Sequence, residues 1–393
     1  MAHIVFVIGN LSDYHIPRYR ALVSLVERAG HQITLVEIFG RSIYSHPQPA
    51  RPLQFSDTSK ALTLFAGTRS AGSTRVVWRI HNVVNELRPD IVITLGYHTE
   101  YSIYLCLRKL ITGKFPLMYM SDSKADDGDR SRTKEAFKRL LVRWFDGALV
   151  AGQRHRDYAL SLGIPLQRSR CGFDVIDVRF FSDAAAACRQ NDAALRSELG
   201  LPDRYVLCVS RLVERKNVAG VVRAFARSGL AAQGYSLVIV GNGPYKARVE
   251  EAIRQADLFS KVVMVENVHN EVMPAFYALG DFLVLASRYD QWGLCANEAM
   301  AAGLPLIVTK GCGCAGEIVI DFENGFVVSE GSEDELSERM RMLGSDRQMR
   351  QQFGIRSREI IDQWTPELFA KSALELTEIL LSPGSSAVKA PSP

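Results

Sequence analysis

The sequence predicts an α/β protein built from two doubly wound, Rossmann-like domains. Short apolar runs alternate with helical patterns in both halves of the chain, which is typical of βαβ units and parallel sheets. Residues 183–200 are helical in composition and separate the two series of strands. A chain of 393 residues is long enough for two cores. We therefore expect domains at 1–182 and 183–362 that face each other across a cleft.

The elements of the first half follow from apolar runs, glycines and prolines. Strands are predicted at 3–8, 31–39, 90–95, 116–120 and 147–150, and helices at 17–29, 76–87, 101–111 and 134–145. Residues 41–75 are rich in Ser, Pro, Arg and Thr, so we expect an insertion or a mobile loop there.

The second half repeats the same alternation. Strands are predicted at 205–210, 236–240, 262–265, 282–286 and 306–308, with helices at 333–343 and 365–381. We expect the helix within 363–381 to pack back on the N-terminal domain and residues 382–393 to form a disordered tail. Ligands of such sheets bind at the carboxyl ends of the strands.

Composition predicts a soluble, cytoplasmic protein. No apolar run is long enough to span a bilayer, and the N-terminus resembles a first strand more than a signal peptide. Seven scattered cysteines suit a reducing compartment. Residues 1–180 carry 25 Lys and Arg against 16 Asp and Glu, whereas the remainder carries 22 against 27.

The basic first half favours contact with an anionic surface such as a membrane, although scattered solvated charges explain it equally well. Within it, the helix at 134–145 places Lys and Arg beside Trp144 and Phe145. Such a helix either lies in a membrane interface or packs on the core. We expect no nucleic-acid partner.

Two carboxylates in the stretch 287–320 are candidate ligand contacts. Asp290 and Glu298 lie eight positions apart, on either side of the turn at 292–294. Glu298 falls on a short helix of small, apolar residues, where a carboxylate needs hydrogen-bond donors, and a ligand diol would supply two. Alternatively, Glu298 is tied to a core Lys or Arg, and Asp290 is a helix N-cap.

Cations follow the first strand of the second half. Arg211 and Lys216 lie at the carboxyl end of that strand and beside a helix N-terminus, where side chains and helix dipole together favour a phosphate. For Arg215, a solvated surface charge and a phosphate contact are equally plausible roles. Residues 241–244, Gly-Asn-Gly-Pro, form a tight turn at the end of the next strand.

Metal-binding patterns are weak. Cys312 and Cys314 form a lone CxC that fits small residues in a tight loop. Asp127 and Asp129 form a DxD triplet in a polar loop, far in sequence from the other motifs. We therefore predict no metal and no cofactor.

Several segments together resemble one enzyme family. VSRLVERKN, LVIVGNGP, DQWGLCANEAMAAGLPLIV, GCGCAGEIV and ENGFVV resemble the retaining GT-B glycosyltransferases of family 4. The resemblance is strong from residue 211 to residue 328, more diffuse at the FDVIDVRFF segment, and limited to the fold over the first 150 residues. It implies a nucleotide-sugar co-substrate, linked to UDP, GDP or dTDP.

The resemblance also implies residue roles. Arg211 and Lys216 match the basic pair that grips the donor diphosphate, and Asp290 and Glu298 match the family's two carboxylates, with Asp290 where Glu is usual. The first contacts the donor sugar and the second the ribose. The implied donor-binding set is Gly9, Arg211, Lys216, Asn242, Val268, Trp292, Gly293, Leu294 and Glu298, with backbone N–H groups acting at 292–294.

The acceptor side is less well marked. His98 and Asp122 each end a strand of the first half, and Asp122 stands where relatives often have a catalytic His. Either could orient an acceptor hydroxyl, whereas a loop histidine satisfied by its neighbours is the alternative for His98. His15 lies nearby in sequence, after Gly9.

The sequence therefore predicts a metal-independent retaining glycosyltransferase that serves polysaccharide, glycolipid or metabolite biosynthesis. Its acceptor would be a glycan, a lipid-linked sugar or a small molecule, reached from the cytoplasm or the inner face of a membrane. The alternatives are a non-catalytic nucleotide-sugar-binding subunit and another GT-B enzyme, such as a phosphorylase or a sugar-nucleotide epimerase. A dinucleotide oxidoreductase is disfavoured because no GxGxxG follows a strand.

Overall fold

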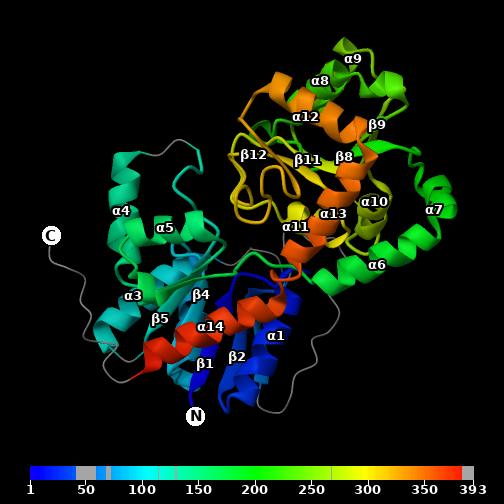
Figure 1. The fold of residues 1–393 in the computed structure, drawn as a ribbon. Coiled ribbons are helices and arrows are strands. Elements are labelled where there is room, and N and C mark those ends of the chain that lie inside the picture. Colours follow the sequence, from blue (N-terminus) through cyan, green and yellow to red (C-terminus); the bar gives the residue numbers. More distant parts are fainter. Residues whose placement is uncertain (41–58, 68–71, 114, 129–130, 267, 383–393) are drawn as a thin grey trace. The chain divides into compact units, whose positions relative to one another are not determined.

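The computed structural model describes residues 1–40, 59–67, 72–113, 115–128, 131–266 and 268–382 (Figure 1). The chain forms two compact units. The first contains residues 1–125, 131–175 and 366–382, and the second contains residues 126–128 and 176–365. The boundary between them falls after Val175 rather than after residue 182, because the helix that starts at Val178 packs in the second unit.

A parallel sheet of seven strands forms the centre of the first unit. Its spatial order is β3-β2-β1-β4-β5-β6-β7. The strands are β1 (His3–Ile8), β2 (Gln32–Phe39), β3 (Ser59–Phe65), β4 (Ile91–Leu95), β5 (Leu117–Ser121), β6 (Gly147–Val150) and β7 (Ser169–Cys171). The inner strands are almost wholly apolar because helices cover both faces of a parallel sheet.

One prediction for this unit was wrong in part. The segment 41–75, expected to be an insertion or loop, contains the edge strand β3, which pairs in parallel with β2. As an edge strand, β3 is mostly exposed or half-buried, so its sequence, SKALTLF, lacks the continuous apolar run of a central strand. Residues 41–58 and 68–71 lie outside the described residues, as does the predicted tail from 383 onward.

The helices of the first unit are α1 (His15–Arg28), α2 (Ser73–Leu87), α3 (Glu100–Thr112), α4 (Arg132–Val142), α5 (Gln153–Ser161) and α14 (Pro366–Leu381). The last helix packs against α1, β6 and β7 (Figure 1). Phe369, Ala373 and Leu376 lie on its buried face at helical spacing. Arg170 of β7 also forms an ion pair with Glu375 of α14, at 3.1 Å.

The second unit repeats the architecture with six parallel strands in the order β10-β9-β8-β11-β12-β13. They are β8 (Tyr205–Val209), β9 (Ser236–Val240), β10 (Val262–Val265), β11 (Phe282–Leu285), β12 (Leu306–Thr309) and β13 (Gly325–Val328). The helices are α6 (Val178–Gln190), α7 (Asp192–Leu199), α8 (Val218–Ser228), α9 (Lys246–Gln255), α10 (Met273–Leu279), α11 (Leu294–Ala301), α12 (Glu333–Ser345) and α13 (Arg347–Ile361).

In each sheet the strand order reverses once, at β1 and β4 in the first unit and at β8 and β11 in the second. The loops that leave neighbouring strands diverge at such a reversal, and the crevice between them is where doubly wound folds bind ligands. In the second unit, this edge carries the loops after β8 and β11.

Candidate functional site

An ion-paired carboxylate lies at the reversal point of the second sheet. Asp290, in the loop after β11, is only 6% exposed. Lys216 Nζ bonds Asp290 Oδ2, and Arg215 Nη1 lies 3.5 Å from Asp290 Oδ1. Arg215 also donates to the Tyr289 carbonyl oxygen at 3.1 Å. The loops after β8 and β11 therefore meet through one carboxylate and two cations.

The backbone fixes Asp290 against the loop that follows β12. The Asp290 N–H donates to the Gly311 carbonyl at 3.0 Å, and the Gly313 N–H donates to the Asp290 carbonyl at 3.0 Å. A Cβ on Gly311 would lie 2.2 Å from the Arg288 carbonyl oxygen, so only glycine allows this approach. Asp290 is not the N-cap of α11, because Gly293 holds that position.

The cations are positioned by a short 3₁₀ turn, η2 (Glu214–Lys216), which ends at Asn217 in the left-handed conformation, with φ of 51°. The chain reverses there before α8 begins. The Arg288 N–H donates to the Arg215 carbonyl at 2.7 Å, which ties η2 to the loop after β11. Arg211 lies in the same loop and is exposed.

The Gly-Asn-Gly turn after β9 supports this loop from its other side. The Leu212 N–H donates to the Asn242 carbonyl at 3.0 Å. A Cβ on Gly241 would lie 2.0 Å from the Ser210 carbonyl oxygen. The Asn242 amide donates to Glu266 at 2.8 Å, so its side chain is directed to the loop after β10, where Val268 is half-buried.

The turn after Asp290 leads into α11. Trp292 is buried, its indole N–H donates to Asn297 Oδ1 at 2.8 Å, and its ring lies 5.3 Å from that of Trp364. Gly293 has φ of 100°, which a side chain would strain. Leu294 is the first residue of α11. The backbone N–H groups at this helix start form a polar edge suited to an anion or a hydroxyl.

Glu298 is buried on α11, one turn inside this helix start. Its Oε2 accepts a hydrogen bond from the hydroxyl of Tyr277, a fully buried residue of α10. The predicted need for a donor is thus met in part by a tyrosine. Nothing in the sequence marked Tyr277, because it lies in a segment in which every residue is buried.

Three thiols surround the Asp290 pair. Cys312 and Cys314 are buried, and Cys295 is the second residue of α11. A hydrogen bond from Cys314 lowers the pKa of Cys312, and the same bond raises that of Cys314 well above its ordinary value. Across the described residues, no group of three or more His, Cys, Asp and Glu is arranged to hold a metal. Asp129 of the predicted DxD triplet lies outside them.

The acceptor-side candidates lie at the corresponding edge of the first unit. Gly9 follows β1, and its carbonyl accepts from the Phe39 N–H at 2.8 Å. His98 is exposed in the loop after β4, with its ring 5.6 Å from that of Tyr97. Asp122 directly follows β5 and lies close enough to Arg18 to raise the pKa of its guanidinium.

Arg18 organises a second polar cluster that the sequence did not indicate. It is buried on α1, where desolvation lowers its pKa, and its Nη2 lies 3.5 Å from Asp174 Oδ1. Its Nε donates to the Val175 carbonyl at 2.8 Å. Burial and the nearby Arg18 charge lower the pKa of His15 to about 3, so this imidazole is neutral at pH 7.

Solved structures share this fold over nearly their whole length. A glycosyltransferase from Rickettsia africae superposes with a TM-score of 0.76 at 15% identity, covering 98% of this chain and all of that one. Sucrose-phosphate synthase from Thermosynechococcus elongatus gives 0.74 at 18% identity, covering 97% and 99%. The two-sheet architecture is therefore the GT-B fold.

The match to a protein family falls within the second unit. Residues 192–360 match the family Glycosyl transferases group 1. This range contains Arg211, Lys216, Asp290 and Glu298.

Curated relatives are similar over part of their length. Alpha-D-kanosaminyltransferase of Streptomyces kanamyceticus is 30% identical over 172 residues, 44% of each chain. A GDP-mannose-dependent phosphatidylinositol monomannoside mannosyltransferase of Mycobacterium tuberculosis is 32% identical, over 47% of this chain and 49% of its own. Alpha-monoglucosyldiacylglycerol synthase of Streptococcus pneumoniae is 30% identical, over 57% and 47%. The matched stretches cover about half the length of these relatives.

Proposed function

We propose that this protein is a retaining glycosyltransferase that moves a sugar from a nucleoside-diphosphate donor to an acceptor hydroxyl. The observation that carries the proposal is the buried Asp290 carboxylate held by Lys216 and Arg215 at the reversal point of the second sheet. Glu298 lies on the helix that starts from the same loop. The match of residues 192–360 to the family Glycosyl transferases group 1 supports the same conclusion.

The cations suit the departure of a diphosphate. Negative charge develops on the leaving phosphate as the bond to the sugar breaks, and fixed cations next to it lower the barrier. We assign Arg211 and Lys216 to this role, and we add Arg215, which shares the Asp290 carboxylate with Lys216. Because these cations balance the charge of the leaving group, we propose that transfer needs no metal.

Glu298 and Asp290 have different surroundings, which fit different parts of the donor. Tyr277 holds Glu298 in place within a small, apolar helix, so the carboxylate is preorganised to accept hydrogen bonds from the ribose diol. Asp290 lies next to the cations and is assigned to the donor sugar. The N–H groups of Trp292, Gly293 and Leu294 would meet the sugar and the phosphate.

We assign the acceptor to the first unit, with Asp122 and His98 as candidates to orient its hydroxyl. Gly9, at the same edge of this sheet, is assigned to the donor. Asp122 is the better placed of the two candidates, because it lies beside the buried Arg18, whereas His98 is exposed. The relatives are named for a phosphatidylinositol mannoside, a diacylglycerol glycolipid and a kanosaminyl transfer, so lipid-linked sugars and small molecules are the acceptors to test first.

The test is a panel of UDP-, GDP- and dTDP-sugars, incubated with and without EDTA, with donor hydrolysis and transfer to candidate acceptors measured by mass spectrometry. We expect one donor to be consumed in EDTA, with retention of the anomeric configuration in the product. Lys216→Met should abolish turnover. Lys261→Met is the matched control, because Lys261 immediately precedes β10 at the opposite edge of the same sheet.

Two outcomes would contradict the proposal. A wild-type protein that binds a donor but neither hydrolyses nor transfers it would be the non-catalytic nucleotide-sugar-binding subunit. Equal turnover by Lys216→Met and Lys261→Met would show that the Lys216 ammonium has no role in the reaction.

A further inference from the structure

We infer that the outer surface formed by α3 and α4 of the first unit binds an anionic lipid bilayer. The first observation is that α4 does not pack on the core along most of its length, since Val142 is its one buried residue. Phe137 is 59% exposed, and Leu140 and Trp144 are exposed at spacings of three and four residues. The helix and the turn that follows it therefore present an apolar stripe to solvent.

A second exposed stripe lies on α3. Leu107, Leu110 and Ile111 share one face of this helix, and Ile111 is 85% exposed. The two helices end side by side, because Lys109 of α3 donates to the Trp144 carbonyl at 2.9 Å. Five large apolar side chains are thus exposed on two neighbouring helices, and Trp144 is exposed in the turn after α4. A gathering of this size exceeds the singly scattered apolar residues of an ordinary surface.

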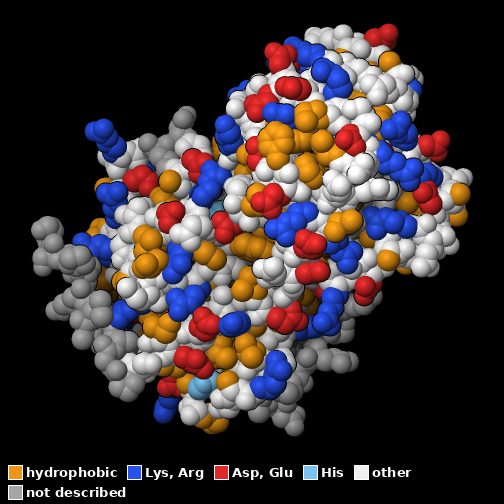
Figure 2. All heavy atoms as spheres, in the orientation of Figure 1, with side chains coloured by type: hydrophobic (Ala, Val, Ile, Leu, Met, Phe, Trp, Pro, Cys, Tyr) orange, Lys and Arg blue, Asp and Glu red, His pale blue; other side chains and the backbone are white. Residues whose placement is uncertain are grey.

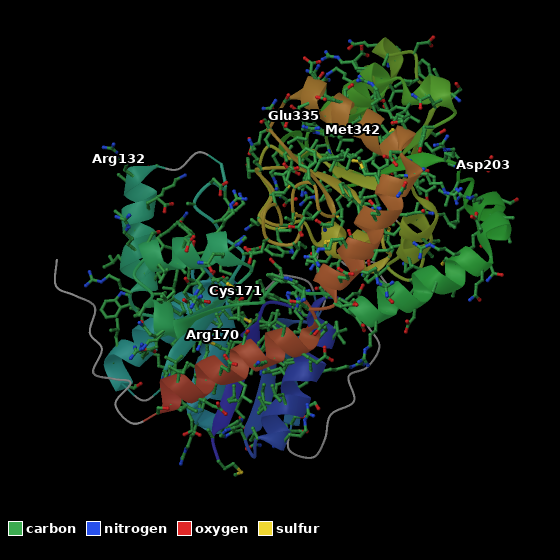
Figure 3. The ribbon with its side chains drawn as sticks, viewed as in Figure 1. Arg132, Arg170, Cys171, Asp203, Glu335 and Met342 are labelled. Atoms are coloured by element: carbon green, nitrogen blue, oxygen red, sulfur yellow. The ribbon has the colours of Figure 1, made fainter. Side chains whose placement is uncertain are left out.

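Basic side chains flank the α4 stripe. Arg132, Lys134, Arg139 and Arg143 are exposed. Glu135 is the one acidic residue of α4, and it is engaged by Lys138 at 2.8 Å and by the Tyr158 hydroxyl at 2.7 Å. Figure 2 shows blue and orange side chains, with some red ones among them, over this part of the first unit, and Figure 3 shows Arg132 extending away from the start of α4.

Charge complementarity selects the occupant. A second copy of the same face would bring four exposed cations against four, and a nucleic acid would leave the apolar stripes in water. An anionic bilayer suits both the cations and the apolar stripes, because its phosphates contact the cations while the apolar side chains enter the headgroup region. No helix in the part of the chain that the structure describes is long and apolar enough to cross a membrane. The contact is therefore with the membrane surface.

The inference goes beyond sugar transfer and is tested without a donor or an acceptor. The full-length protein is floated with vesicles of phosphatidylcholine alone or with 30–40% phosphatidylglycerol, at roughly 50 and 300 mM salt. We expect binding to the anionic vesicles that weakens with salt. Loss of each basic residue should weaken it about fivefold, so Arg139→Gln/Arg143→Gln should weaken it roughly 25-fold. Phe137→Ser/Leu140→Ser should weaken it at least tenfold.

Matched controls come from the second unit. Phe259 and Ile355 are exposed apolar residues there, so Phe259→Ser/Ile355→Ser should leave vesicle binding unchanged. Trp144 reports directly on insertion: its fluorescence should be quenched by brominated lipid in the wild type, and Trp144→Phe should remove that quenching. The remaining tryptophans are Trp78 on α2 and the neighbouring pair Trp292 and Trp364.

Three results would overturn the inference. One is no binding to either vesicle. Another is equal loss of binding in the Phe259→Ser/Ile355→Ser control and in Phe137→Ser/Leu140→Ser. The third is concentration-dependent dimerisation without lipid, measured by sedimentation, that the α4 variants abolish; this result would assign the surface to a second copy of the chain.

Discussion

Replacing either partner of the Lys216–Asp290 pair should change nucleoside-diphosphate binding in opposite directions. In the absence of ligand, the Lys216 ammonium forms an ion pair with the Asp290 carboxylate. A diphosphate must compete with that carboxylate for the cation. Asp290→Asn keeps the shape of the side chain but removes its charge, so the ammonium is more available to the diphosphate, whereas Lys216→Met removes the cation itself.

The magnitudes follow from the contacts. A hydrogen bond to a charged group contributes about 1.5–3 kcal/mol, so Lys216→Met should weaken binding of the cognate diphosphate roughly 10- to 150-fold. Asp290→Asn should tighten it by a few-fold to about tenfold, since the neutral amide still accepts weakly from Lys216 and Arg215. Turnover should fall in both variants, because we assign Asp290 to the donor sugar.

Isothermal titration with UDP, GDP and dTDP measures the affinities, and urea unfolding of the two single variants and the double variant measures the coupling. Lys216→Met leaves a buried carboxylate with only Arg215, at 3.5 Å, so we expect a loss of about 1–3 kcal/mol in unfolding free energy. Adding Asp290→Asn should recover part of that loss. Equal weakening of diphosphate binding by both single variants would refute the competition between carboxylate and phosphate.

Three further outcomes are expected. Glu298→Gln should weaken nucleotide binding about tenfold and reduce the preference for ribo- over 2′-deoxyribonucleotides, with a smaller effect of the same kind for Tyr277→Phe, all measured by calorimetry. Gly241→Ala should lower the unfolding free energy by roughly 2–4 kcal/mol, because its Cβ would lie 2.0 Å from a carbonyl oxygen, whereas Gly234→Ala has open space and should cost less. The low pKa of His15, about 3, means that the unfolded chain binds a proton below pH 6.5 while the folded protein does not. Stability should therefore fall as the pH drops from 6.5 towards 3, by at most about 2 kcal/mol at pH 5, and His15→Gln should flatten that part of the profile in urea titrations.

The central strands could be predicted from the sequence because a parallel sheet covered on both faces demands continuous apolar runs. The inner strands β1, β6 and β9 have the predicted bounds, as does the apolar edge strand β10. The edge strand β3 was missed because most of its residues are exposed or half-buried, which leaves a mixed polar and apolar pattern. The helices α9 and α13 were also missed, since many of their residues are polar or charged.

That Lys216 and Asp290 lie at one edge of the second sheet could be predicted, because chain order in a doubly wound fold places the ends of β8 and β11 beside each other. Sequence spacing could not show that Asp290 pairs with both Arg215 and Lys216. Arg215 and Lys216 are adjacent in the chain, and both reach Asp290 only because the 3₁₀ turn and the left-handed Asn217 orient them that way. Tyr277, the partner of Glu298, was hidden in an apolar segment. Residue roles in catalysis stay predictions.

A crystal structure of the protein with its cognate nucleotide sugar would test the central claim most directly. We predict that the diphosphate contacts Lys216 Nζ and Arg211 within about 3.2 Å, with the ribose hydroxyls on the Glu298 carboxylate. A nucleotide bound elsewhere, with the Lys216–Asp290 pair undisturbed and Glu298 without contact to the ribose, would contradict it.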